Sequence, residues 1–256
     1  MRKPLFIANW KMNLNLSAQE HLVDGIIKQV IPSDLDVIVC PSYTNIPYVS
    51  QKIKNINIAL GAQDVSWVDK GSMTGEVSAD MLVDFGVEYV IIGHSERREK
   101  MGETEKQVNE KVIACLKNNL IPIICVGETL EEKQAGQTDS KIERQVSTAL
   151  KNIKLNKNQS IIIAYEPIWV IGTGKVVDAS VAEHEAKVIR SVVHDCLHDL
   201  GRETDDLVTV LYGGSVASDN VNDFLSNIIR GVLVGGASLE VDEFGNIIKA
   251  LSGQSS

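Results

Sequence analysis

Lys11, His94 and Glu166 each stand at the end of a short apolar run of the sequence. An ammonium can offset an oxyanion or hold a phosphate group, and a neutral imidazole can donate a hydrogen bond to an oxygen. A carboxylate can accept a proton. The three side chains are therefore a candidate catalytic set, provided that the fold brings the ends of the three runs together.

Glu166 lies in the stretch AYEPIWVIGTGK, residues 164–175. A residue before proline is kept out of the helical region, so Glu166 should continue the strand, while Pro167 stiffens the start of the loop and Gly172 and Gly174 free its end. The four apolar residues between them suit a lid that covers a ligand and excludes water. A carboxylate beneath such a lid loses hydration and becomes a stronger base. The alternative is a strand-end glutamate paired with a surface lysine, beside a loop packed on the core.

His94 and Lys11 can each be interpreted in two ways. Ser95 is a helix-capping residue type, so a short helix is predicted there, and its positive end would favour a neutral imidazole at His94. The alternative is a structural histidine bonded to the backbone. Lys11 and Asn9 are two apart, so on a strand they would point to one face. The alternative is a solvated lysine.

Two glycine pairs end the last two apolar runs, in GGS at 213–215 and GG at 235–236. Backbone N–H groups approach a ligand closely where side chains are absent, and in α/β barrels the last two strand ends commonly cradle phosphate. We therefore take these two glycine turns as a candidate phosphate cradle; ordinary tight turns are the alternative.

Two further motifs resemble known binding sites, but each lacks a residue that the site requires. GTGK at 172–175 resembles the end of a nucleotide-binding loop, but Trp169 stands where that loop needs glycine and Val176 where it needs serine or threonine. His194 and His198 have zinc-like spacing, but the glutamate of the metalloprotease motif is replaced by aspartate, and the segment is predicted to be an outer helix. We expect no metal in the reaction.

The elements that position these residues alternate along the chain. Eight short apolar runs are predicted strands, and most are continuously apolar, as in strands buried on both faces: 5–10, 36–41, 57–62, 88–93, 121–126, 160–166, 207–212 and 231–234. Helical patterns lie between most of them, at 17–30, 105–118, 141–152, 180–200 and 220–229, the first with a capping box at Ser17 and Glu20. The alternation predicts a closed (β/α)8 barrel, with a doubly wound open sheet as the alternative.

The composition sets the class of protein. The chain has 256 residues and a net charge of −9, which argues against nucleic acid or an acidic membrane surface as a partner, because both need a basic face. None of the four cysteines forms a C-x-x-C pair, and no apolar run reaches the roughly 18 residues of a membrane span. These features predict a cytoplasmic protein. No linker or composition shift divides the chain, so residues 1–256 are predicted to be a single domain.

Taken together, the motifs resemble the triosephosphate isomerase family from end to end. The matching stretches are NWKMN (9–13), GAQDVS (61–66), TGEVS (74–78), IIGHSERR (91–98), CVGE (125–128), AYEPIW (164–169), IGTGK (171–175), YGGSV (212–216) and LVGGASL (233–239). The resemblance implies a single (β/α)8 TIM barrel that interconverts dihydroxyacetone phosphate and D-glyceraldehyde 3-phosphate through an enediolate, in glycolysis and gluconeogenesis. It implies no cofactor and no metal.

The resemblance also implies a role for each candidate residue. Glu166 is implied to be the base that moves a proton between C1 and C2, and His94 the neutral donor to the carbonyl and enediolate oxygens. Lys11 and Asn9 are implied to add electrostatic and hydrogen-bond support. The phosphate of the small triose substrate is implied to bind Gly172, Ser215, Gly235 and Gly236. Ser95, Glu96 and Cys125 match positions that surround this set.

Members of the family are usually homodimers, in which the loop around Thr74 enters the neighbouring subunit near its site. The chain departs from the family pattern at Ala8, Asp64, Met73 and Val170, none of them a catalytic group. Two other classes stay open at this point. They are another phosphosugar enzyme on the same barrel and a non-catalytic barrel that binds a phosphorylated ligand.

Overall fold

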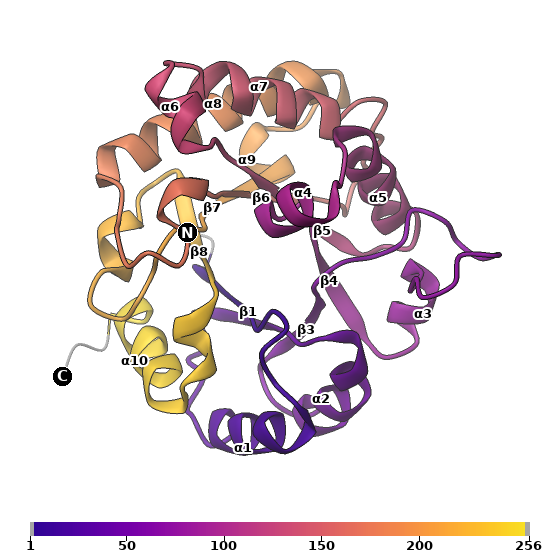
Figure 1. Ribbon diagram of the computed structural model, residues 1–256, viewed down its shortest axis with the longest axis vertical. Coiled ribbons are helices and arrows are strands. Elements are labelled where there is room, and N and C mark those ends of the chain that lie inside the picture. The colour runs from indigo at the N-terminus through magenta and orange to yellow at the C-terminus, as the bar shows by residue number, and fades with distance from the viewer. Residues whose placement is uncertain (1–2, 254–256) are drawn as a thin grey trace.

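Eight parallel strands close into a barrel in the order β1 to β8. The structure is a computed structural model that describes residues 3–253 (Figure 1). The strands are β1 (Leu5–Asn9), β2 (Asp36–Cys40), β3 (Ala59–Ala62), β4 (Val87–Ile92), β5 (Ile121–Val126), β6 (Ile161–Tyr165), β7 (Val208–Tyr212) and β8 (Ile229–Val234). Since β1 pairs with β8, the predicted barrel is confirmed and the open doubly wound sheet is wrong.

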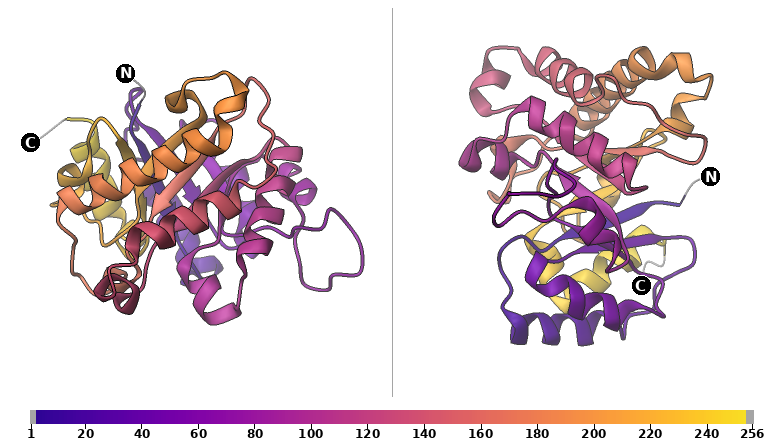
Figure 2. Two further views of the ribbon diagram at one scale, coloured as in Figure 1. Left: turned by 90° about the horizontal axis from the view of Figure 1, so that it is seen from above. Right: turned by 90° about the vertical axis from the view of Figure 1, so that its right-hand side faces the viewer.

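The helices surround the barrel as an outer layer (Figures 1 and 2). The α-helices are α1 (Leu16–Ile26), α2 (Ile46–Ile53), α3 (Ala79–Val83), α4 (Ser95–Met101), α5 (Glu105–Lys117), α6 (Leu130–Gln134), α7 (Thr138–Ala149), α8 (Ala179–Leu197), α9 (Thr204–Leu207) and α10 (Val241–Leu251). Short 3-10 helices are η1 (Tyr43–Asn45), η2 (Ile168–Val170), η3 (His198–Leu200), η4 (Val221–Phe224) and η5 (Gly236–Leu239). Within the described residues, no helix is long and apolar enough to cross a membrane.

The continuous apolar runs are explained by burial on both faces of the strands. In β1, Phe6 and Ala8 pack outward with the helices, whereas Ile7 points into the barrel. The interior cluster is made of alternate strand residues, namely Ile7, Ile38, Cys40, Ile91, Ile123, Cys125, Ile162, Ala164, Leu211 and Leu233. A filled interior leaves the rims of the barrel as the place for a ligand.

Two of the predicted local features outside the candidate site are wrong. The predicted helix at 220–229 is only the 3-10 helix η4, because Ser226 ends it: its hydroxyl accepts hydrogen bonds from the N–H groups of Ile228 and Ile229, and β8 begins there. The capping box at Ser17 and Glu20 is also absent. Helix α1 begins one residue earlier, and the side chain of Asn15 accepts from the N–H of Ala18 at 2.9 Å.

Candidate active site

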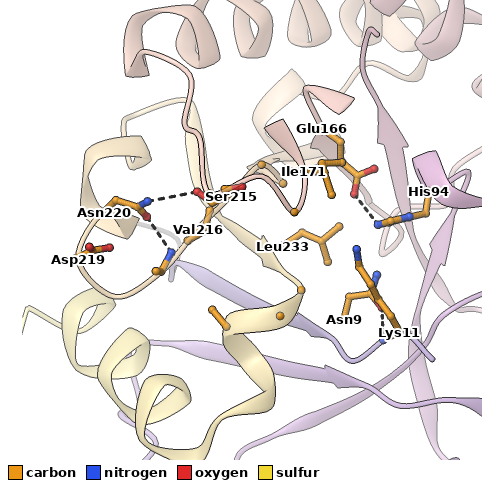
Figure 3. Close-up of a pocket in the computed structure, with 18 residues that line it drawn as sticks. Asn9, Lys11, His94, Glu166, Ile171, Ser215, Val216, Asp219, Asn220 and Leu233 are labelled. Atoms are coloured by element: carbon orange, nitrogen blue, oxygen red, sulfur yellow. Dashed lines mark hydrogen bonds and ion pairs between the residues drawn. The ribbon is translucent and has the colours of Figure 1, made fainter. Parts of the chain in front are cut away.

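A cavity of about 450 Å³ opens at the carboxyl-terminal ends of the strands. All the site residues predicted from the sequence line it, namely Asn9, Lys11, His94, Glu166, Gly172, Ser215, Gly235 and Gly236. Figure 3 shows Glu166, His94 and Lys11 on one side of the cavity and Ser215 on the other, with Leu233 between them. The barrel therefore brings together side chains that lie up to 206 positions apart in the sequence, from Asn9 to Ser215.

Glu166 is held by close backbone contacts where β6 ends. Its N–H donates to the carbonyl of Val126 at 2.7 Å, and the N–H of Gly213 donates to the carbonyl of Tyr165 at 2.8 Å. A Cβ on Gly127 would lie 1.8 Å from the carbonyl oxygen of Glu166, and a Cβ on Gly213 would lie 2.9 Å from its Cγ. Glycine at both neighbours is thus what lets the strand ends pack around this carboxylate, which is only 2 % exposed.

His94 faces the carboxylate of Glu166 with a defined tautomer. Its Nδ1 accepts a hydrogen bond from the N–H of Glu96 at 3.2 Å, so in a neutral ring the proton is on Nε2. That Nε2 lies 3.3 Å from Oε1 of Glu166, while Oε2 accepts from the N–H of Ser95 at 3.4 Å. The predicted short helix is confirmed as α4, but its N-cap is His94 itself rather than Ser95.

Lys11 reaches the cavity by a different route from the one expected. Strand β1 ends at Asn9, and Lys11 has a left-handed backbone with φ of 52°. Two hydrogen bonds hold the backbone of Lys11 in place. Its N–H donates to Oδ1 of Asn9 at 3.1 Å, and Nε2 of Gln63 donates to its carbonyl at 2.8 Å. The prediction that Lys11 and Asn9 share one face of a strand is therefore wrong, although both side chains do line the cavity.

The other side of the cavity is formed by glycines and one serine. A Cβ on Gly236 or Gly172 would meet no atom within 4 Å, so their backbone is open to a ligand. A Cβ on Gly235 would lie 3.2 Å from Cε of Lys11. The hydroxyl of Ser215 donates to the carbonyl of Val170 at 2.7 Å. Lys11 is the only lysine or arginine among the described residues lining the cavity, so an anion would find its one cation there.

Only part of the apolar loop after Pro167 faces the cavity. Val170 is fully buried in the core, and Ile171 lines the cavity. Trp169 packs against the core, its Nε1 donates to Oε1 of Glu128 at 2.8 Å, and Nζ of Lys133 lies 3.5 Å from the centroid of its ring. The loop combines both interpretations of the sequence, with an anchored first half and a second half at the cavity.

Cys125 lies inside the barrel at the end of β5, next to Glu166. Burial, reinforced by the charge of Glu166 and a hydrogen bond to it, raises the pKa of the Cys125 thiol well above its usual range. The group therefore stays protonated at neutral pH and is a poor nucleophile. The histidine pair at 194 and 198 is on the outer helix α8 and in η3, as expected, with Nδ1 of His194 at 3.2 Å from Oγ1 of Thr204.

Comparison with known proteins agrees with this arrangement. A family model described as triosephosphate isomerase matches residues 4–251. The chain belongs to the triosephosphate isomerase family. It is 43% identical over 249 residues to the triosephosphate isomerase of Thermoanaerobacter sp. (strain X514), covering 97% of this chain and 99% of the relative. The same coverage holds at 42% identity for that of Alkaliphilus oremlandii and at 41% for that of Clostridium botulinum.

Membership of the triosephosphate isomerase family confirms the resemblance seen in the sequence. Several residues that complete the site had no role in the sequence argument. Gly127 and Glu128 were recognised only as part of the motif CVGE at a strand end. In the structure, Glu128 supports the loop through Trp169, and Asn220 accepts from the N–H of Ala217 at 3.0 Å beside the cavity. Gly127 could have been found from the sequence, because it is a glycine that directly follows a buried strand. The other two depend on contacts between distant segments.

Proposed function

We propose that this protein interconverts dihydroxyacetone phosphate and D-glyceraldehyde 3-phosphate, with no cofactor and no metal ion. The observation that carries the proposal is the 3.3 Å separation of Glu166 Oε1 and His94 Nε2 in a cavity that also contains Lys11. A base, a neutral donor and a cation within one cavity match the needs of a proton transfer next to a carbonyl. At about 450 Å³ the cavity is in the size range of small-molecule sites.

In this proposal the two sides of the cavity divide the substrate between them. The phosphate lies against Gly172, Ser215, Gly235 and Gly236. At Gly172 and Gly236 the space of a side chain is open, so a ligand can approach the backbone closely. The carbon chain then extends toward Glu166 and His94. Such a placement explains why a cavity in an acidic protein can select an anion: the backbone and Lys11 supply the local positive potential.

The proposed reaction moves one proton from C1 to C2 and a second proton from the C1 hydroxyl to the C2 oxygen, while the carbonyl moves from C2 to C1. Glu166 removes a proton from C1 of the ketone, and the Nε2–H of His94 donates to the carbonyl oxygen, which becomes the enediolate oxygen. The C1 hydroxyl then gives its proton to the C2 oxygen, Glu166 returns its proton to C2, and the carbonyl group forms at C1. Lys11 and Asn9 stabilise the negative charge that develops on the oxygens. The hydrogen bond from the N–H of Glu96 to Nδ1 supports the proposal, because it keeps the proton of a neutral ring on Nε2.

A coupled assay tests this function. Purified protein is given D-glyceraldehyde 3-phosphate, and dihydroxyacetone phosphate is followed through NADH oxidation by glycerol-3-phosphate dehydrogenase. We expect rapid turnover that inorganic phosphate inhibits competitively, and little turnover of unphosphorylated glyceraldehyde. Turnover of a longer sugar phosphate alone would assign another phosphosugar reaction. Phosphate binding without turnover of any sugar phosphate would assign a binding protein.

We further propose that the protein is a homodimer joined through the loop around Thr74. The loop between β3 and α3 projects from the barrel in Figure 2, and Thr74, Gly75 and Glu76 are exposed. Helix α3, which follows, exposes Met81 and Val83. Sedimentation equilibrium at micromolar concentration should give twice the mass of the chain, and Thr74→Arg should shift it toward the monomer. A monomeric wild-type protein would contradict the proposal.

We propose a cytoplasmic location as well. All four cysteines are free thiols, and three of them are buried, as expected in a reducing compartment. Fractionation of the source cells with an antibody to the protein tests this; recovery with a secreted fraction would contradict it.

A further inference from the structure

Three side chains that can bind metal ions meet where α7 packs against α8, outside the cavity described above. Asp139 lies in the first turn of α7, and His184 and Glu185 lie on α8; the two helices are neighbours in Figure 1. One ligand atom from each residue lies within 4.8 Å of the other two. None of the three lines the active-site cavity.

Glu185 is the member of this group that needs explanation. Its side chain is 3% exposed, and within the described part of the chain its Oε2 has no hydrogen-bond partner. A buried carboxylate oxygen without a partner is costly, because it has lost its hydration and gained nothing in exchange. Asp139 and His184 are exposed, so an ion can approach the buried carboxylate from solvent between them.

The charges around Glu185 leave it short of positive partners. Burial first, and then the charge of Asp139, raise the pKa of Glu185 to about 7, and Glu128 acts in the same direction. His184 is the one group that acts in the opposite direction among those that influence Glu185 in the described residues. A divalent cation would compensate two carboxylates at once, whereas a protonated histidine can compensate only one.

The spacing of His184 and Asp139 fits ligands of one ion. Nε2 of His184 lies 3.3 Å from both Oδ1 and Oδ2 of Asp139, in a long hydrogen bond that the two oxygens share. Ligands at about 2.1 Å from a tetrahedral zinc ion lie roughly 3.4 Å from one another. The exposed pair is therefore already at the spacing that two zinc ligands adopt, and Glu185 is the third within reach.

We propose that Asp139, His184 and Glu185 bind one divalent transition-metal ion of the Zn²⁺ class, with water completing the coordination. One imidazole with two carboxylates favours such an ion over Mg²⁺, which prefers oxygen ligands alone. The ion joins the start of α7 to the second turn of α8, the helix that directly follows the loop at residues 167–178. Its role is structural, and it is separate from the proposed isomerisation.

Metal-stripped full-length protein tests the proposal by calorimetric titration and by thermal unfolding with added ZnCl2 or MgCl2. We expect one zinc ion bound per chain. Zinc at about 100 times its dissociation constant should raise Tm by roughly 5–10 °C, because an ion that binds only the folded state stabilises it by an amount that grows with the logarithm of its concentration over the dissociation constant. MgCl2 at the same concentration should leave Tm unchanged. The absence of saturable zinc binding to the wild-type chain would overturn the proposal.

Variants locate the ion. His184→Gln and Asp139→Asn alter exposed residues and should fold, and each should weaken zinc binding at least tenfold and remove most of the shift in Tm. Glu185→Gln keeps the shape of the buried side chain and should do the same. The matched control is His194→Gln, an exposed histidine further along α8 that should change neither readout. Loss of zinc binding in the control, with binding retained in His184→Gln, would place the ion elsewhere and overturn the proposal.

Discussion

Nζ of Lys11 donates a hydrogen bond to Oε1 of Glu96 across 2.9 Å, so the cation of the candidate active site is paired with a carboxylate of α4. Partial burial of Glu96 acts to raise the pKa of its carboxyl group. The hydrogen bond from Lys11 and the charge of Lys11 outweigh burial and hold that pKa below its usual range. An anionic substrate must therefore attract an ammonium group that already has a partner.

Lys11→Met should raise the pKa of Glu96, because the hydrogen bond and the charge that lower it are both removed. A carboxyl group with a lowered pKa in the folded state adds stability above about pH 4.3 that is lost as the pH falls through the folded pKa. The variant should therefore lose less stability than the wild type over that acidic range. Carboxyl-carbon NMR titration measures the pKa, and Lys157→Met, at an exposed position, is the control. An unshifted Glu96 would contradict the pairing.

The same substitution should impair both the binding of the substrate and its turnover. Lys11→Met should raise KM and lower kcat together, because one cation would hold the substrate anion and stabilise the enediolate. Steady-state kinetics with D-glyceraldehyde 3-phosphate provide the test, again with Lys157→Met beside it. If kcat/KM is the same in both variants, Lys11 has no part in the reaction.

Glu166→Asp should reduce kcat by about 100-fold or more with a much smaller change in KM. The substitution keeps the charge and withdraws the carboxylate by one methylene, and a displacement of about 1 Å can cost this much. The backbone held by Gly127 and Gly213 leaves little room to compensate. Glu131→Asp, on the exposed face of α6, serves as the matched control. A kcat near that of the control would reject Glu166 as the base.

Shortening the second half of the loop should divert the intermediate to a side product. Replacing residues 171–174 by a two-residue turn leaves buried Val170 in place, so the barrel should still fold. The enediolate can break its C–O bond to phosphate, which releases inorganic phosphate and methylglyoxal when that bond leaves the enediolate plane. Without the loop to hold the phosphate and exclude water, phosphate released per isomerisation should rise. An unchanged ratio would mean that the loop affects only the rate.

Lys111→Met should destabilise the fold without touching the cavity. Lys111 is 1% exposed, and its Nζ lies 2.6 Å from Oδ1 of Asp64 and also contacts Glu103. Removing the cation leaves two buried carboxylates with only Arg97, among the described residues, as their remaining cation; it lies 2.8 Å from Asp64 and 3.5 Å from Glu103. Breaking such a buried pair costs about 3–5 kcal/mol. Urea unfolding measures this loss, with Lys106→Met as a control on the exposed face of the same helix. Equal midpoints for the two variants would contradict the argument.

The amino-acid sequence by itself determined the order of the elements and the main set of site residues. Strands buried on both faces leave continuous apolar runs, and each predicted run ends within two residues of an observed strand end. In a parallel barrel every strand ends on the same rim, so residues that follow the runs must share it. That rule is sufficient to bring Lys11, His94 and Glu166 together, because it depends on the alternation of strands and helices and on the shared direction of the strands rather than on any particular contact.

The tertiary structure alone decided the contacts between segments that are distant in the chain. The pairing of Lys11 with Glu96 joins positions 85 apart, and the bond from Trp169 to Glu128 joins positions 41 apart. The group at Asp139 and Glu185 depends on how α7 packs on α8. No local pattern encodes such pairs, since side chains of these types are usually solvated and only closure of the barrel sets their distances. The helix starts at Asn15 and His94 were settled in the same way, by whichever side chain reached the free N–H groups.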